Sequence, residues 1–205
     1  MTNKFWLSPA IALLAAASFA SAASAQAAKP AAPKAAPKAA AKPEAKPKSD
    51  PTEQAVLLGQ FDGWGAYKAT PGGKKVCFAL AKPTSATMEP ASRKRDPSYA
   101  FISTRPSEKV KNEVSVIVGY PQKSGVDASA AIGTTTYVMY TQNDGAWVKN
   151  AADEAQMVNA MRKGGDLVVK SESGRVVDGK TARSTDVFSL KGIGAALDKV
   201  AEECK

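Results

Sequence analysis

The chain has 205 residues, of which 44% are hydrophobic, and a formal net charge of +9. It contains no histidine, which excludes Ser-His-Asp and Cys-His nucleophile systems and every histidine-bearing metal site. Two cysteines cannot form a Cys₄ zinc site, and neither a Walker A nor a Rossmann glycine pattern occurs. We therefore expect no enzyme activity, no cofactor and no metal.

Residues 1–25 have the pattern of a signal peptide. Lys4 supplies positive charge, an apolar stretch follows from Phe5, and the small residues Ala23-Ser24-Ala25 form a cleavage signature before Gln26. The apolar stretch falls short of the ~20 residues that a membrane-spanning helix needs. The alternative is a retained anchor, but serine and proline residues interrupt the stretch. We expect export, to the periplasm or the outer membrane.

Residues 26–55 are rich in alanine, proline and lysine and are predicted to form a disordered linker. Proline at this density disfavours helix and sheet, and repeated charge extends the chain. The simplest interpretation is a soluble spacer. The alternative is a lysine-rich tether in peripheral contact with the outer membrane or peptidoglycan. Nucleic acid is not an expected partner, because no arginine stripe with stacking aromatics occurs.

Residues 56–205 are enough for one domain, and their pattern predicts mainly strands. Strand-like segments are rich in β-branched and aromatic residues and end at glycine, proline or Asn-Asp turns. They are expected at 61–69, 75–80, 98–104, 113–120, 134–142, 146–148, 166–171 and 185–190. With two short helices, one of them C-terminal, they predict a single β-sandwich-like domain.

The two helices have recognisable boundaries. Asn150 is a candidate N-cap for the first helix, which ends at Gly164 and carries Met157, Val158 and Met161 on one face. The second covers 192–203. Its apolar stripe, at helical spacing, consists of Ile193, Leu197, Val200 and Cys204.

Cys77 and Cys204 are the only cysteines, and an even count in an exported chain favours a disulfide. Cys204 lies on the apolar stripe and should face the sheet that carries Cys77. The bridge would close a loop of more than 100 residues and stabilise the fold by roughly 4 to 5 kcal/mol. The alternative is two separate buried thiols.

Arg93, Lys94 and Arg95 form a short basic run inside the segment 83–97, which is expected to be an exposed loop. A run of this kind is usually only solvated. If the domain binds an anionic partner, this loop is the first candidate for the contact.

Two other residue sets could carry chemistry. The aromatic residues Trp64, Tyr120 and Trp147 could stack on sugar rings, although their strand positions favour core packing. The carboxylates Asp144, Asp153 and Glu154 could serve a hydrolase, although turn and helix-cap roles explain them more simply.

The chain resembles the invasion-associated locus B family of exported Gram-negative proteins. The resemblance covers roughly 61–204 and rests on the leader, the Ala/Pro-rich spacer, Trp64, Cys77, the run Val187-Phe188-Ser189-Leu190-Lys191-Gly192 and the terminal Cys204. It implies an all-β envelope protein; some members are linked to host-cell invasion and virulence, and no catalytic or cofactor residue is attached to the pattern.

We thus expect a non-catalytic exported envelope protein that acts by interaction, in envelope integrity or in host-cell invasion. Its partner would be an envelope or host-surface protein or polymer. The alternatives are a peptidoglycan- or carbohydrate-binding module and, with less support, a carboxylate-based hydrolase.

Overall fold

The computed structural model describes residue 52 and residues 54–205. The leader expected over 1–25, and most of the linker expected over 26–55, lie outside these residues. The described part is mainly β, with eleven strands in one open antiparallel sheet and two α-helices, one of them C-terminal. This confirms the predicted mainly β fold class with two helices, and the strands form one hydrogen-bonded sheet where a β-sandwich has two. Within this part of the chain, neither helix is long and apolar enough to cross a membrane.

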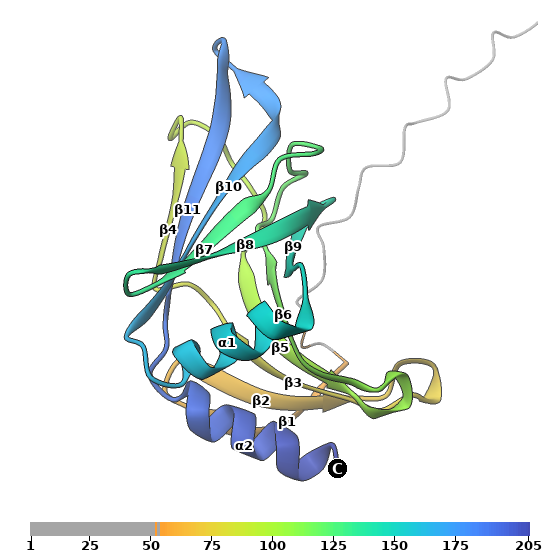
Figure 1. Ribbon diagram of the computed structural model, residues 1–205. Coiled ribbons are helices and arrows are strands. Elements are labelled where there is room, and N and C mark those ends of the chain that lie inside the picture. Colours follow the sequence, from red (N-terminus) through yellow and green to blue (C-terminus); the bar gives the residue numbers. More distant parts are fainter. Residues whose placement is uncertain (1–51, 53) are drawn as a thin grey trace, which may run out of the picture. The chain divides into compact units, whose positions relative to one another are not determined.

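The sheet combines strands that are far apart in the sequence. Across it the order is β1-β2-β3-β5-β6-β9-β8-β7-β10-β11-β4 (Figure 1). In chain order the strands are β1 (Val56–Phe61), β2 (Trp64–Ala69), β3 (Val76–Ala81), β4 (Ser85–Glu89), β5 (Tyr99–Arg105), β6 (Val110–Ile117), β7 (Ala128–Ile132), β8 (Thr135–Gln142), β9 (Gly145–Val148), β10 (Asp166–Val177) and β11 (Lys180–Ser189). Two short 3₁₀ turns, η1 (Pro71–Gly73) and η2 (Pro106–Glu108), precede β3 and β6.

Three of these strands were not expected from the sequence, namely β1, β4 and β7. Strand β4 lies within the segment 83–97 that was expected to be a loop, so that expectation is wrong for residues 85–89. It is an edge strand that pairs only with β11, and most of its side chains are exposed. A strand with so little to bury has no apolar alternation to reveal it.

The two helices begin and end close to where the sequence places them. Helix α1 (Ala151–Met161) starts at Asn150, whose Oδ1 accepts a hydrogen bond of 2.9 Å from the backbone N–H of Asp153. Helix α2 (Ile193–Glu203) packs on β1, β2 and β3 (Figure 1). The buried faces are the predicted ones, made by Met157, Val158 and Met161 in α1 and by Ile193, Ala196, Leu197 and Val200 in α2.

Strand alternation divides the side chains between a core face and an outer face of the sheet. The core face carries both helices and a large apolar cluster that includes Trp64, Cys77, Met139, Leu167 and Phe188. On β3, Phe78 and Leu80 point the other way and form a smaller cluster with Tyr99. The outer face is the one on which ligands could reach side chains of the central strands.

Candidate functional site

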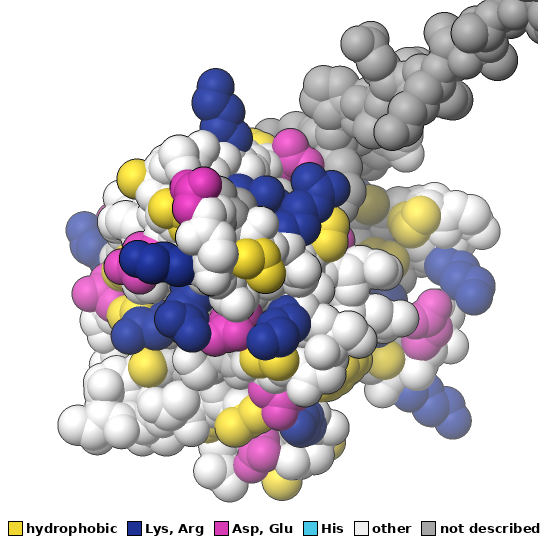
Figure 2. All heavy atoms as spheres, turned by 90° about the horizontal axis from the view of Figure 1, so that it is seen from above, with side chains coloured by type: hydrophobic (Ala, Val, Ile, Leu, Met, Phe, Trp, Pro, Cys, Tyr) yellow, Lys and Arg dark blue, Asp and Glu magenta, His cyan; other side chains and the backbone are white. Residues whose placement is uncertain are grey.

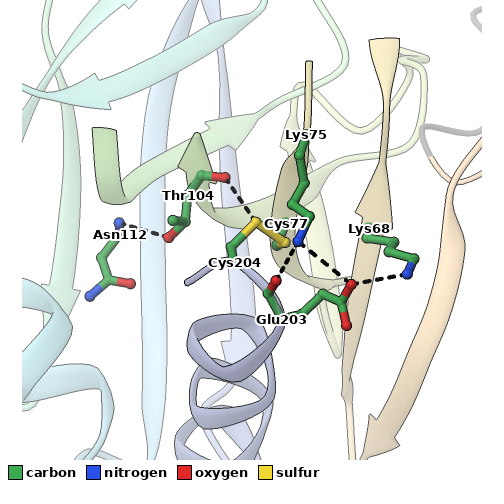
Figure 3. Close-up of a disulfide and its surroundings, with 7 residues drawn as sticks. All are labelled: Lys68, Lys75, Cys77, Thr104, Asn112, Glu203 and Cys204. Atoms are coloured by element: carbon green, nitrogen blue, oxygen red, sulfur yellow. Dashed lines mark hydrogen bonds and ion pairs between the residues drawn. A yellow bond between two sulfur atoms is a disulfide. The ribbon is translucent and has the colours of Figure 1, made fainter. Parts of the chain in front are cut away.

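Cys77 in β3 and Cys204 at the end of α2 form a disulfide across 127 residues of sequence (Figure 3). This confirms the predicted pairing. Around it, the carboxylate of Glu203 accepts a hydrogen bond of 2.9 Å from Lys68 Nζ, and Lys75 Nζ donates to the Glu203 carbonyl oxygen at 2.7 Å. The bond from Lys68 lowers the pKa of Glu203. The end of α2 is therefore fastened to the sheet by a covalent bond and by ionic contacts.

The basic run does not form one exposed loop. Arg95 turns inward and forms a buried ion pair with Asp186 of β11, with side-chain exposures of 8% and 0%. Arg93 is half-buried, and only Lys94 is fully exposed. The expectation of an exposed loop is therefore wrong for Arg95, because its guanidinium is the counter-ion of a buried carboxylate. Contact of the remaining loop with an anionic partner stays a prediction.

Charges of both signs are mixed on the described surface. Figure 2 shows lysine and arginine side chains interspersed with acidic ones on the face in view. Many are close pairs, such as Arg183 with Glu172 at 2.9 Å and Lys149 with Asp127 at 2.6 Å. A face of this kind does not select a strongly charged polymer by its field alone.

Two of the three candidate aromatic residues belong to the core. Trp64 is fully buried and donates its indole N–H to the Ser189 carbonyl oxygen at 2.8 Å. Tyr120 is also buried, and its hydroxyl lies 2.7 Å from Ser184 Oγ. Their expected core role is confirmed, and neither is accessible to a ligand.

Trp147 differs, because it lies half-buried on the outer face of β9 and stacks on Tyr140 of β8. The ring centroids are 5.6 Å apart and the planes are inclined by 22°. A Cβ placed on Gly145 would lie 2.2 Å from the Trp147 ring, so the indole occupies the space that a side chain would fill at this glycine. Tyr140 is 41% exposed, and Val138, two residues earlier on the same face, is 51% exposed. We call Val138, Tyr140 and Trp147 the aromatic platform.

A concave polar surface of about 400 Å³ adjoins this platform. It is lined by Thr87, Glu89, Val126, Asp127, Ser129, Lys170, Ser171, Glu172, Arg183, Ser184 and Thr185, and we call it the polar groove. Its wall on β7 is next to the platform, because Ser129 lies directly opposite Val138 in the sheet. The alternation of residues along 134–142 places Val138 and Tyr140 on one side of the strand, but no sequence pattern indicates the groove.

The three candidate carboxylates have structural surroundings. Asp153 accepts a hydrogen bond of 2.7 Å from Asn150 Nδ2 at the start of α1. Glu154 Oε1 accepts a bond of 2.8 Å from the backbone N–H of Val114 and so fastens α1 to β6. Burial raises the pKa of Glu154. Asp144 lies in the β8–β9 turn, where its carbonyl oxygen accepts a bond from Val118 N. The expected cap and turn roles account for Asp153 and Asp144, and the anchor of α1 on β6 accounts for Glu154.

Comparisons with known proteins give one structural similarity. No family model matches the chain, and no curated protein sequence matches it. The crystal structure of invasion associated protein B from Bartonella henselae is similar at 12% sequence identity and a TM-score of 0.46. The similarity covers 72% of this chain and 98% of the other. It concerns the fold and assigns no function.

Proposed function

We propose that this chain is an exported, non-catalytic binding protein of the bacterial envelope, in the periplasm or associated with the outer membrane. The observation that carries the proposal is the Cys77–Cys204 disulfide. Structural disulfides form and persist in oxidising compartments, and the leader pattern of residues 1–25 offers the route to one.

The side chains exposed on the outer face of the sheet support binding rather than catalysis. Of the three carboxylates named as hydrolase candidates, those of Asp153 and Glu154 are engaged in holding α1, and Asp144 lies in the β8–β9 turn. The accessible groups of the outer face are aromatic rings, hydroxyls and charges of both signs. Such groups recognise a partner by stacking and hydrogen bonding, without covalent chemistry.

The partner is an envelope or host-surface protein or polymer, and the role is envelope integrity or host-cell invasion. The words "invasion associated" are part of the name of the Bartonella protein and describe that protein. For this chain, the lysine-rich linker offers a second, peripheral contact with the outer membrane or peptidoglycan.

Protease treatment of intact cells tests the location. The chain is followed by immunoblot on non-reducing and reducing gels, with osmotically shocked and lysed cells as controls. Release by osmotic shock, or cleavage in intact cells, together with a mobility shift on reduction, supports an oxidised envelope protein. Retention in the cytoplasmic fraction with free thiols would overturn the proposal.

A further inference from the structure

We propose that the aromatic platform and the polar groove form one extended site for a neutral oligosaccharide chain. The proposal rests on the binding function above and names its site and the chemistry of its ligand. It is argued from register, exposure and charge on the outer face.

The two surfaces are continuous because of the strand order. Lys170 on β10 lies opposite Ser129 on β7, and Ser129 lies opposite Val138 on β8. Tyr140, on the same face of β8 as Val138, lies opposite Trp147 on β9. These are three strand-to-strand steps of about 4.8 Å, which together span about 14 Å. A ligand that contacts both surfaces is therefore longer than a single sugar ring.

The platform presents an apolar surface suited to a sugar ring. Trp147 lies against Gly145 and stacks on Tyr140, so little side-chain freedom is lost when a ligand binds it. Five large apolar side chains are exposed among the described residues, and Val138 and Tyr140 are the two that share a strand face. Stacking of a pyranose C–H face would cover this pair.

The groove supplies hydrogen-bonding groups that the fold leaves unused. Within the part of the chain that the structure describes, the side chains of Glu89, Ser129, Lys170 and Thr185 make no hydrogen bond or ion pair. The lining carries two cations, Lys170 and Arg183, and three carboxylates. Because opposite charges nearly cancel, the groove favours a polyhydroxylated neutral ligand over an anionic one.

Two other occupants fit less well. An extended peptide would add to a free strand edge. The platform strands offer none, because β8 is paired with β7 and β9, and β9 with β6 and β8. The free edge at the groove belongs to β4, on the side of the groove away from the platform. A second copy would need an interface of about 1,200 Å² or more, whereas the platform is small and its neighbour is polar. Self-association remains an outcome of the test.

The test is a titration of the disulfide-bonded chain, purified from the envelope fraction of a producing strain. Chitotetraose and cellotetraose are the neutral probes, and an oligogalacturonate is the anionic one. Trp64 is buried, so Trp147 is the tryptophan of the described part whose emission should respond to a ligand. The variants are Trp147→Ala, Tyr140→Ala and Thr185→Val. Tyr137→Leu, on the core-facing side of the same strand, is the matched control.

We expect at least one neutral probe to change the emission, with a Kd about tenfold higher for Trp147→Ala measured by calorimetry. Tyr137→Leu should bind as the parent does. Absence of binding to both probes, equal binding by Trp147→Ala, or binding only to an oligogalacturonate would overturn the proposal. So would self-association that Trp147→Ala abolishes without any sugar binding. None of these results bears on export, which the protease experiment decides separately.

Discussion

Arg95 and Asp186 form a two-pronged ion pair between the β4–β5 loop and the middle of β11. Both terminal nitrogens of Arg95 donate to the carboxylate, one of them at 2.7 Å, and Nη1 also donates to the Val118 carbonyl oxygen at 2.9 Å. The Asp186 side chain is fully buried, and that of Arg95 is nearly so. The loop is thereby joined to β11 and to the segment that follows β6, and its position depends on a polar contact inside the fold.

Removing one partner of this pair should be far more harmful than removing both. In Asp186→Ala the Arg95 charge stays buried without a counter-ion, and we expect a loss of about 3–5 kcal/mol in the free energy of unfolding. The double variant Arg95→Met/Asp186→Leu should recover much of that loss. Urea unfolding measures both. The exposed pair Arg183–Glu172 is the control, and Glu172→Ala should cost under about 1 kcal/mol. Equal losses in the single and double variants would contradict this account.

The disulfide should stabilise the fold chiefly by restricting the unfolded chain. For a separation of 127 residues, the chain-entropy relation gives about 5 kcal/mol. We expect Cys77→Ala/Cys204→Ala to unfold at much lower urea concentration. Reductant should shift the parent to the same midpoint and leave the variant unchanged. If a thiol assay shows the two cysteines fully reduced and the urea midpoint of the parent is unchanged, the cross-link contributes little to stability.

The parts of the fold that the sequence predicted are those with a local pattern. The stripe of Ile193, Leu197 and Val200 repeats at helical spacing, and it placed Cys204 on the buried side of α2. Asn150 likewise precedes a helix whose first turn is acidic. In each case the residues that decide the structure lie within a few positions of one another.

What the sequence did not reveal depends on contacts between distant residues. Arg95 and Asp186 are 91 positions apart, so nothing near Arg95 distinguishes it from the exposed Lys94. The polar groove needs four strands whose order differs from their order in the chain. Alternation assigned Tyr140 to one face of β8 but could not show that this face is left uncovered.

Glu154 and Glu203 should give the stability of the domain opposite dependences on pH. Burial raises the pKa of Glu154 above its ordinary value of 4.5, so the folded state holds this proton more tightly than the unfolded state. Its contribution is present below pH 4.5 and is lost as the pH rises through the raised pKa. Glu154→Gln keeps an acceptor for the backbone N–H of Val114. As the pH rises through the raised pKa, this variant should therefore become more stable relative to the parent.

Glu203→Gln is the counterpart with the opposite sign. Lys68 lowers the pKa of Glu203, so its contribution is present above pH 4.5 and is lost as the pH falls through the lowered pKa. The variant should therefore be less stable than the parent near neutral pH and approach it in acid. Urea midpoints measured across the acidic and neutral range check both. Parallel profiles for the two variants would contradict the assignment.

Gly192 explains in physical terms why the junction between β11 and α2 carries a glycine. Its φ is +88°, and a Cβ would lie 2.1 Å from the carbonyl oxygen of Phe61. Gly192→Ala must therefore move α2 away from β1, and we expect a loss of about 3 kcal/mol or more. Gly194, the second residue of α2, is the matched control. The atom nearest to a Cβ placed there is Arg162 Nη1, at an ordinary contact distance of 3.7 Å. Gly194→Ala should gain about 0.5–1 kcal/mol from helix propensity. Thermal unfolding monitored by circular dichroism compares the two, and similar shifts for both alanines would mean that the close approach of Phe61 does not require the glycine.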